Sequence, residues 1–167
     1  GFLLDIINRF MNGLDIDDEE VRYKTIVEEC LYFVDINNDN INVCIDLIDK
    51  ERKYKLNYIV GNTLEIKDLF GIQFSLIVCN PPFSMYGLKK TGNSLWYRFI
   101  KKCLTEWSEN DGNLLFITPA GWRKPTNKKC RFYGLYDLIT RDNQLVSLNI
   151  EGFNSGFKMF NSFTRYD

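Results

Sequence analysis

Four consecutive residues, Asn80-Pro81-Pro82-Phe83, follow directly after an apolar run at residues 74–79. Such a run predicts a buried strand, and ligands of open α/β sheets bind beyond the carboxyl ends of the strands. The two prolines fix φ and lack an N–H, so they leave the carbonyls of the turn available as acceptors. With an amide and a flat aromatic ring, the tetrad suits a planar base that bears an exocyclic amino group. The alternative interpretation is an ordinary Asn-Pro turn beside a core phenylalanine.

The rest of the chain alternates between helix and strand patterns, which predict the elements that position this turn. We expect helices at residues 2–10, 38–50, 94–107 and 129–140. We expect strands at residues 31–36, 55–60, 74–79, 113–118, 144–150 and 159–166. Asp111 and Gly112 are expected to form the turn before the fourth strand. The alternation predicts an α/β fold with a mostly parallel sheet and helices on both faces.

Several segments together resemble S-adenosylmethionine-dependent methyltransferases that modify the N6 amino group of adenine in DNA. The tetrad is similar to the NPPF/NPPY motif of phage and restriction-modification methylases. The other segments that carry the resemblance are residues 31–36, 59–64, 92–100, 113–123 and 160–167. The resemblance implies a Rossmann-like methyltransferase fold with one antiparallel strand among the last ones. It also implies that residues 1–167 are a partial catalytic domain, in which we find no target-recognition region.

The resemblance assigns a catalytic role to the tetrad as a whole. The implied catalytic residues are Asn80, Pro81, Pro82 and Phe83. The Asn80 side-chain oxygen and the Pro81 carbonyl are expected to accept the two hydrogens of the adenine amino group. Phe83 is expected to stack on the adenine after the base has left the double helix.

The expected cofactor is S-adenosylmethionine, and the residues implied to bind it are Asp35, Ile36, Asn62 and Leu64. Asp35 ends a strand, where a carboxylate can bind both ribose hydroxyls, although a helix cap is the alternative. Ile36 is expected to pack on the cofactor's adenine, and Leu64 to form either a further apolar wall or part of the core. Asn62 stands where the family usually has an aspartate, so its amide oxygen would accept the adenine amino hydrogen without a charge.

Positive charge is concentrated immediately after the tetrad. Residues 84–131 contain ten Lys and Arg residues but only three Asp and Glu residues. Residues 1–83, by contrast, contain eight Lys and Arg residues and fifteen Asp and Glu residues. A basic stretch beside a base-binding pocket indicates a surface for nucleic-acid phosphates. The residues expected to bind DNA are Lys89, Lys90, Arg123, Lys124, Lys128 and Lys129. Lys101 and Lys102 suit the solvated face of a helix equally well. Trp96, Trp107 and Trp122 are expected to be packing residues, and Trp122 is the one of the three most expected to lie exposed near the DNA.

The composition excludes several other chemistries. The chain has no histidine, which excludes Ser-His and Cys-His catalysis and the usual zinc sites, so no metal is expected. Five cysteines without a C-x-x-C pair indicate reduced thiols. Cys79 precedes the tetrad instead of following a proline, so we expect a core residue and not the nucleophile of a cytosine-C5 enzyme. No apolar run reaches the roughly 18 residues of a membrane span, and a cytoplasmic location without membrane contact is expected.

The first residues, Gly1-Phe2-Leu3-Leu4, resemble the end of the family's glycine-rich turn. We therefore expect an interior fragment from which the first central strand of the sheet is missing. Three other functions stay open, namely guanine-N2 RNA methylation, glutamine-N5 protein methylation and a non-catalytic remnant of the fold. The basic stretch favours a nucleic acid over a protein substrate. The oligomeric state and an associated restriction endonuclease or recognition domain are left open.

Overall fold

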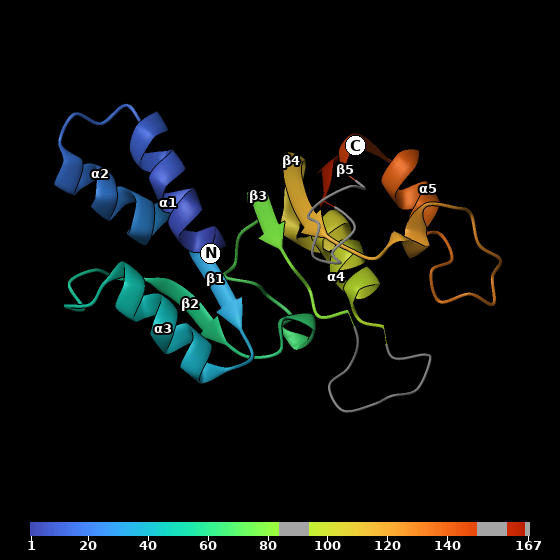
Figure 1. Ribbon diagram of the computed structural model, residues 1–167, viewed down its shortest axis with the longest axis horizontal. Helices are drawn as coiled ribbons and strands as arrows, with labels where there is room; N and C mark the ends of the chain where they lie inside the picture. The colour runs from blue at the N-terminus through green and yellow to red at the C-terminus, as the bar shows by residue number, and fades with distance from the viewer. Residues whose placement is uncertain (84–93, 150–159, 166–167) are drawn as a thin grey trace. The chain divides into compact units, whose positions relative to one another are not determined.

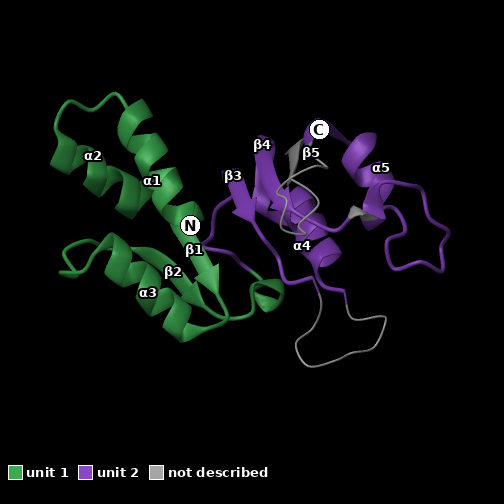
Figure 2. Cartoon of the chain, viewed as in Figure 1, with its two compact units in different colours: residues 1–67 green, residues 68–167 purple. Residues whose placement is uncertain are grey.

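The structure is a computed structural model that describes residues 1–83, 94–149 and 160–165 of the 167-residue chain (Figure 1). The chain divides into two compact units, residues 1–67 and residues 68–167, drawn in green and purple in Figure 2. Each unit contains its own sheet. Within the described residues, no helix is both long enough and apolar enough to cross a membrane.

The first unit combines a two-stranded sheet with helical segments. Its elements are α1 (Phe2–Gly13), α2 (Glu19–Thr25), the π-helical segment η1 (Ile26–Cys30), β1 (Tyr32–Asp35), α3 (Asn38–Ile48), β2 (Asn57–Val60) and the short 3₁₀ helix η2 (Thr63–Glu65). β1 and β2 pair in parallel, with Asp35 opposite Val60. Asp18 and Asn37 begin α2 and α3, because each side-chain oxygen accepts a backbone N–H of the first turn.

The helices and strands expected in this unit are confirmed, with ends that differ by a few residues. α2 and η1 were not anticipated from the sequence. The guanidinium of Arg22 fixes α2 to the preceding chain, because it donates to the backbone carbonyls of Met11 and Ile16, each over 2.7 Å. This anchor depends on a contact between distant residues, which a local hydrophobic pattern does not reveal.

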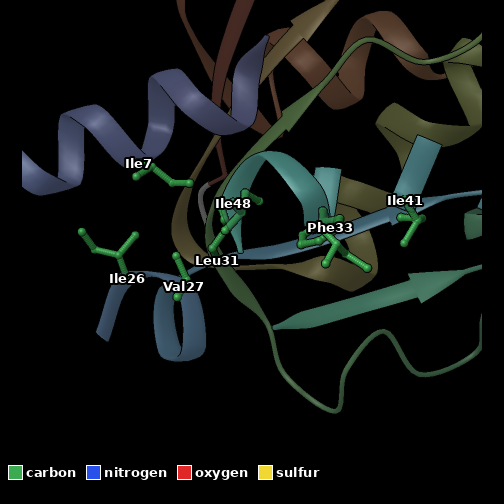
Figure 3. Close-up of a cluster of buried hydrophobic side chains, with 8 residues drawn as sticks. Ile7, Ile26, Val27, Leu31, Phe33, Ile41 and Ile48 are labelled. Atoms are coloured by element: carbon green, nitrogen blue, oxygen red, sulfur yellow. The ribbon is translucent and has the colours of Figure 1, made fainter. Parts of the chain in front are cut away.

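Aliphatic side chains from α1, η1, β1 and α3 form the core of the first unit (Figure 3). The buried cluster consists of Ile7, Ile26, Val27, Leu31, Phe33, Ile41, Ile45 and Ile48. The three α3 members lie at helical spacing, so one face of that helix packs on the cluster while the opposite face meets solvent. Each fully buried side chain of this size stabilises the fold by about 1.5–3 kcal/mol relative to exposure. The cluster therefore fixes β1, which ends at Asp35, and α3, which begins shortly after Ile36.

The second unit contains a four-stranded mixed sheet. Its elements are β3 (Phe74–Cys79), α4 (Trp96–Lys102), the π-helical segment η3 (Cys103–Trp107), β4 (Ser108–Ile117), η4 (Ala120–Trp122), α5 (Leu135–Thr140), β5 (Asn143–Asn149) and β6 (Phe160–Arg165). The strand order is β3-β4-β6-β5, with β3 parallel to β4 and β6 antiparallel to both of its neighbours. The α/β class and the late antiparallel strand are confirmed. The expectation of a mostly parallel sheet does not hold for the described strands of this unit, because β3 and β4 pair in parallel but β6 pairs antiparallel with both β4 and β5. The strand expected outside residues 1–167 stays a prediction.

The turn predicted at Asp111 and Gly112 is wrong, because both residues lie inside β4. The pairing of β3 with β4 shifts in register after Phe74, and Asp111 adopts a φ of 62° at this irregularity. Gly112 is tightly enclosed there. A Cβ atom at Gly112 would lie 2.9 Å from the backbone oxygens of Glu109 and Phe74, so the contact requires glycine.

Of two expected helices in this unit, one is confirmed and one is shorter than predicted. The helix predicted at residues 94–107 is confirmed as α4 followed without a break by the π-helical η3, which ends at Trp107 before β4 begins at Ser108. The helix predicted at residues 129–140 is wrong in its first half, since α5 begins at Leu135. Gly134 lies before it with a φ of 77°, a left-handed conformation that interrupts a continuous helix. Residues 127–133 instead form hydrogen-bonded turns.

Candidate functional site

Asp35 lies at the carboxyl end of β1, and its carboxylate is oriented by two hydrogen bonds. One oxygen, Oδ1, accepts the backbone N–H of Asn37 over 2.7 Å. The other, Oδ2, accepts the side-chain amide of Asn40 over 3.1 Å. Asn37, not Asp35, accepts the first-turn N–H of α3, so the N-cap role belongs to Asn37. Each carboxylate oxygen has a second lone pair, which leaves Asp35 able to accept further hydrogen bonds from a ligand.

The turn after β2 lies beside Asp35 because the two strands are parallel neighbours. The backbone N–H of Gly61 donates to the carbonyl of Asp35 over 2.9 Å. The next residue, Asn62, uses its side-chain oxygen to accept the N–H of Leu64 over 3.3 Å and its amide nitrogen to donate to Glu65 over 2.8 Å. The Asn62 amide is thus held in one orientation, with its nitrogen toward the Glu65 carboxylate and its oxygen toward the backbone N–H of Leu64.

Apolar side chains flank this edge of the first sheet. Ile36 is 72% exposed, the largest exposed fraction among the large hydrophobic residues that the structure describes. Leu64 is half-buried. The Ile36 side chain therefore contributes nothing to the core of the first unit. The structure therefore brings Asp35, Ile36, Asn62 and Leu64 to the ends of two paired strands, as the sequence predicts.

The tetrad lies where β3 leaves the sheet of the second unit. Asn80 and Pro82 are exposed, Pro81 is buried, and Phe83 is 36% exposed. The carbonyl of Phe83 accepts the N–H of Leu95 over 3.3 Å, which ties the tetrad to the residue before α4. The alternative of a core phenylalanine does not fit a ring with this exposure. The tetrad presents one amide side chain and one aromatic face to solvent.

Cys79 has no features of a catalytic nucleophile. Burial raises the pKa of its thiol to about 12. Burial also raises the pKa of the Cys103 thiol well above its ordinary value, with a smaller contribution from Cys79. Because the thiolate is the reactive form, a thiol with this pKa stays protonated and inert near neutral pH. Cys79 itself is half-buried, whereas Cys103 is buried, so the expectation that Cys79 is a core residue is met only in part.

The segment that follows β4 leaves the sheet at the same edge as the tetrad. β3 and β4 are parallel, with Cys79 opposite Phe116, so their carboxyl ends lie together. The expectation that Trp122 is a packing residue is confirmed, since its side chain is only 2% exposed, and the alternative of a ring exposed near the DNA is wrong. Its indole N–H donates to the Thr118 hydroxyl over 3.3 Å, which satisfies the polar atom of an otherwise apolar ring. Trp122 is a packing residue that fixes the start of the next segment.

That next segment carries most of the cations predicted to bind DNA. Arg123, Lys124, Lys128 and Lys129 are all exposed. Lys89 and Lys90 lie outside the described residues. By contrast, Lys102 has an ion pair with Glu106 at 3.2 Å, and Lys101 Nζ donates to the carbonyl of Tyr133 over 3.3 Å. These local partners favour the interpretation of Lys101 and Lys102 as ordinary helix-surface residues.

Four residues around the candidate site were not identified from the sequence. Asn37 and Asn40 contact Asp35, and their signal was two asparagines within five residues of a strand-terminal aspartate. Gly121 and Phe132 contact each other at the two ends of the basic segment, since a Cβ on Gly121 would lie 3.1 Å from the Phe132 ring. No local pattern in the sequence predicts this second pair, because eleven residues separate its members.

The fold is similar to that of a solved protein from Listeria monocytogenes, which is described provisionally as a class I S-adenosylmethionine-dependent methyltransferase. The match has a TM-score of 0.55 and 12% sequence identity, and it covers 80% of this chain and 44% of the other. The chain thus spans less than half of that protein's length. At this identity the likeness establishes a shared fold alone. No protein-family model matches the chain, and no curated protein matches it.

Proposed function

We propose that this chain belongs to an S-adenosylmethionine-dependent DNA methyltransferase that modifies the N6 amino group of adenine. The observation that carries the proposal is the tetrad at residues 80–83, which leaves the carboxyl end of β3 with an exposed amide and a partly exposed aromatic ring. The fold shared with a class I methyltransferase supports the reaction class. Ligands of open α/β sheets bind at this edge, which supports the location.

The residues at the ends of β1 and β2 fit a nucleoside cofactor. Asp35 has acceptor capacity for the ribose hydroxyls, and the exposed side chain of Ile36 offers an apolar surface for the adenine ring. Leu64 adds a second apolar surface. The Asn62 oxygen, which already accepts from Leu64, has one lone pair left for the amino group of the cofactor's adenine. S-adenosylmethionine, when bound, supplies an electrophilic methyl group.

The tetrad suits an amino group as the methyl acceptor. The lone pair of an adenine amino nitrogen is delocalised into the ring, so this nitrogen is a poor nucleophile. If the Asn80 oxygen and the Pro81 carbonyl each accept one of its hydrogens, the nitrogen is held with its lone pair outside the ring plane. Orientation and electrostatic placement then supply the catalysis without a covalent enzyme intermediate. The nitrogen would form the new bond to the methyl carbon while the carbon–sulfur bond breaks and its electron pair leaves with S-adenosylhomocysteine. The nitrogen would then lose one proton to solvent.

Phe83 would capture the adenine once it leaves the double helix. Base flipping is required because a paired adenine is inaccessible to a protein pocket. Stacking of a base on an aromatic ring is worth about 1–3 kcal/mol. The exposed fraction of Phe83 and the hydrogen bond that anchors its carbonyl to Leu95 support a fixed stacking surface.

The test is transfer of tritium from methyl-labelled S-adenosylmethionine, with duplex DNA, RNA and protein offered as separate acceptors. Digestion of the product to nucleosides and chromatography identifies the modified base. We expect label in N6-methyladenine from DNA. Label in N2-methylguanine from RNA, or in glutamine of a protein, would assign the chain to one of the other methyltransferase classes. No transfer to any acceptor would indicate a non-catalytic remnant.

A further inference from the structure

Residues 123–131, which we call the basic loop, form a strongly cationic segment of the second unit. Its charged residues are Arg123, Lys124, Lys128, Lys129 and Arg131, and the loop has no acidic residue. All five are exposed. Within the parts of the chain that the structure describes, none of the five has a carboxylate within 4.0 Å. The loop therefore presents a net charge of +5 without local neutralisation.

A packed aromatic residue lies at each end of the basic loop. At its start, Trp122 is buried and bonded to Thr118. At its end, the Phe132 ring packs on Trp96, with ring centroids 5.0 Å apart and an interplanar angle of 41°. The same ring packs on Tyr97, with centroids 5.5 Å apart and an interplanar angle of 72°. Such aromatic pairs stabilise a structure beyond the effect of the area that they bury.

Gly121 brings the start of the loop against its end. A Cβ atom at this position would lie 3.1 Å from Phe132 Cε2 and 3.5 Å from Trp96 Cζ2. A methyl group in that place would push on the Phe132 ring. The absence of a side chain at Gly121 thus allows the two ends of the loop to meet on Trp96.

Hydrogen bonds also order the second half of the loop. The side chain of Asn127 accepts the N–H of Lys129 over 3.1 Å, and its backbone carbonyl accepts the N–H of Cys130 over 2.9 Å. The N–H of Tyr133 donates to the carbonyl of Cys130 over 3.0 Å. The guanidinium of Arg131 lies 5.4 Å from the centroid of the Phe132 ring. Lys128, Lys129 and Arg131 are therefore presented by ordered turns.

We propose that the basic loop is a contact surface for the phosphate backbone of duplex DNA, and that Phe132 is its positioning residue. This proposal rests on the proposed function for its choice of DNA. Each cation that neutralises a phosphate releases a counterion, which favours binding and makes it depend on salt. A loop that is ordered before binding loses less conformational entropy on the DNA. Contacts to phosphates position a duplex without reading its sequence, so the surface acts on all sequences alike.

The test measures binding of a fluorescent duplex by anisotropy, without cofactor, over a range of salt concentrations. The loop variant is Lys124→Glu with Lys128→Glu and Lys129→Glu. The control has the same change in net charge in the first unit, with Lys50→Glu, Lys55→Glu and Lys67→Glu, all at exposed positions. We expect the loop variant to bind at least about tenfold more weakly and to reduce the salt slope by about 2–3, because each phosphate contributes about 0.9. Equal effects of the two variants would overturn the proposal.

The role of Phe132 is tested by variants that leave every charge in place. Phe132→Leu is expected to lower the affinity for DNA several-fold and to speed hydrogen exchange at the amides of Lys129, Cys130 and Tyr133. Phe132→Tyr, which keeps the aromatic ring, is expected to have the DNA affinity and the hydrogen-exchange rates of wild type. If Phe132→Leu fails to fold, Gly121→Ala carries the same test, because its methyl group displaces the ring. Wild-type affinity in a folded variant that exchanges faster would overturn the positioning role.

The outcomes separate this inference from the proposed function. Methylation of adenine in DNA together with a salt slope that the loop variant leaves unchanged would overturn the inference and keep the function. Salt-dependent binding through the loop without methyl transfer would keep the phosphate surface and overturn the function. Equal or tighter binding of duplex RNA would overturn the assignment to DNA.

Discussion

The side-chain amide of Asn40 donates a hydrogen bond to the carboxylate of Asp35 over 3.1 Å, from the first turn of α3 to the end of β1. A second donor, the N–H of Asn37, bonds the other carboxylate oxygen. Two donors on opposite oxygens limit rotation of the carboxylate. A ligand that binds Asp35 therefore meets an acceptor whose direction is already set, which reduces the cost of ordering on binding.

We predict that Asp35→Ala weakens binding of S-adenosylhomocysteine by about tenfold or more, since hydrogen bonds to a charged group contribute about 1.5–3 kcal/mol. Asn40→Ala should weaken it less, because the carboxylate remains and only its orientation is lost. Isothermal titration calorimetry measures both affinities. Asn42→Ala, at an exposed position on the same helix, is the control.

A ligand without the ribose hydroxyls tests whether Asn40 acts through Asp35. For a 2′,3′-dideoxy analogue of the cofactor, Asn40→Ala and wild type should bind with equal affinity. If Asn40→Ala weakens both ligands by the same factor, its role is to stabilise the start of α3.

Phe83 should contribute to capture of the flipped base and not to the stability of the sheet. We expect Phe83→Ala to raise KM for DNA by roughly ten- to a hundredfold, which corresponds to the loss of one stacked base. Phe83→Trp should retain much of the affinity, because stacking requires a flat ring. Fluorescence of 2-aminopurine at the target position reports the extrahelical base directly. A Phe83→Ala protein that melts several degrees earlier but has the KM of wild type would instead place this ring in the core.

The buried thiol of Cys79 predicts a dependence of stability on alkaline pH. Its pKa is about 12 in the folded protein, whereas an ordinary thiol has a pKa of 9.0. Above pH 9 the unfolded thiol releases its proton while the folded thiol keeps it, so the free energy of unfolding falls as the pH rises from 9 to about 12. Urea unfolding at several pH values should show a shallower fall for Cys79→Ala than for wild type. Parallel curves would contradict the burial of this thiol.

Trp122 should act on stability and only indirectly on DNA binding. Replacement of a buried Trp by Ala costs about 3–5 kcal/mol, and this ring is 2% exposed. We therefore predict a large loss in the midpoint of urea unfolding for Trp122→Ala. Trp122→Phe should lose less, because it keeps most of the apolar volume and forfeits the hydrogen bond to Thr118. A Trp122→Ala protein with unchanged stability and weaker DNA binding would restore the interpretation of an exposed tryptophan.

The parts of the fold that local patterns determine were predicted from the sequence. The apolar run at residues 74–79 gives the bounds of β3, and the tetrad follows it as expected. Asp35 likewise ends β1. The signal of an apolar run lies within the strand itself. The burial expected for β3 is not observed, because its residues are half-buried or exposed and Leu76 is 47% exposed.

The parts that the sequence did not reveal depend on contacts between distant residues. The start of β4 at Ser108 depends on the close approach of Gly112 to Phe74 in the neighbouring strand. The burial of Trp122 follows from packing in the second unit and from its bond to Thr118. The orientation of Asp35 depends instead on a local contact, because Asn40 lies only five residues further along the chain.

The central claim is that the Asn80 amide holds the methyl acceptor, and one comparison tests it most directly. The rate of tritium transfer into DNA adenine is measured for wild type, for Asn80→Ala and for Asn110→Ala, a control at an exposed asparagine of β4. Affinity for S-adenosylhomocysteine and the thermal midpoint are measured on the same proteins. We predict that Asn80→Ala abolishes transfer with both of these values unchanged, while Asn110→Ala behaves as wild type. An Asn80→Ala protein that melts early yet methylates adenine at the wild-type rate when folded would show that the tetrad is a structural turn.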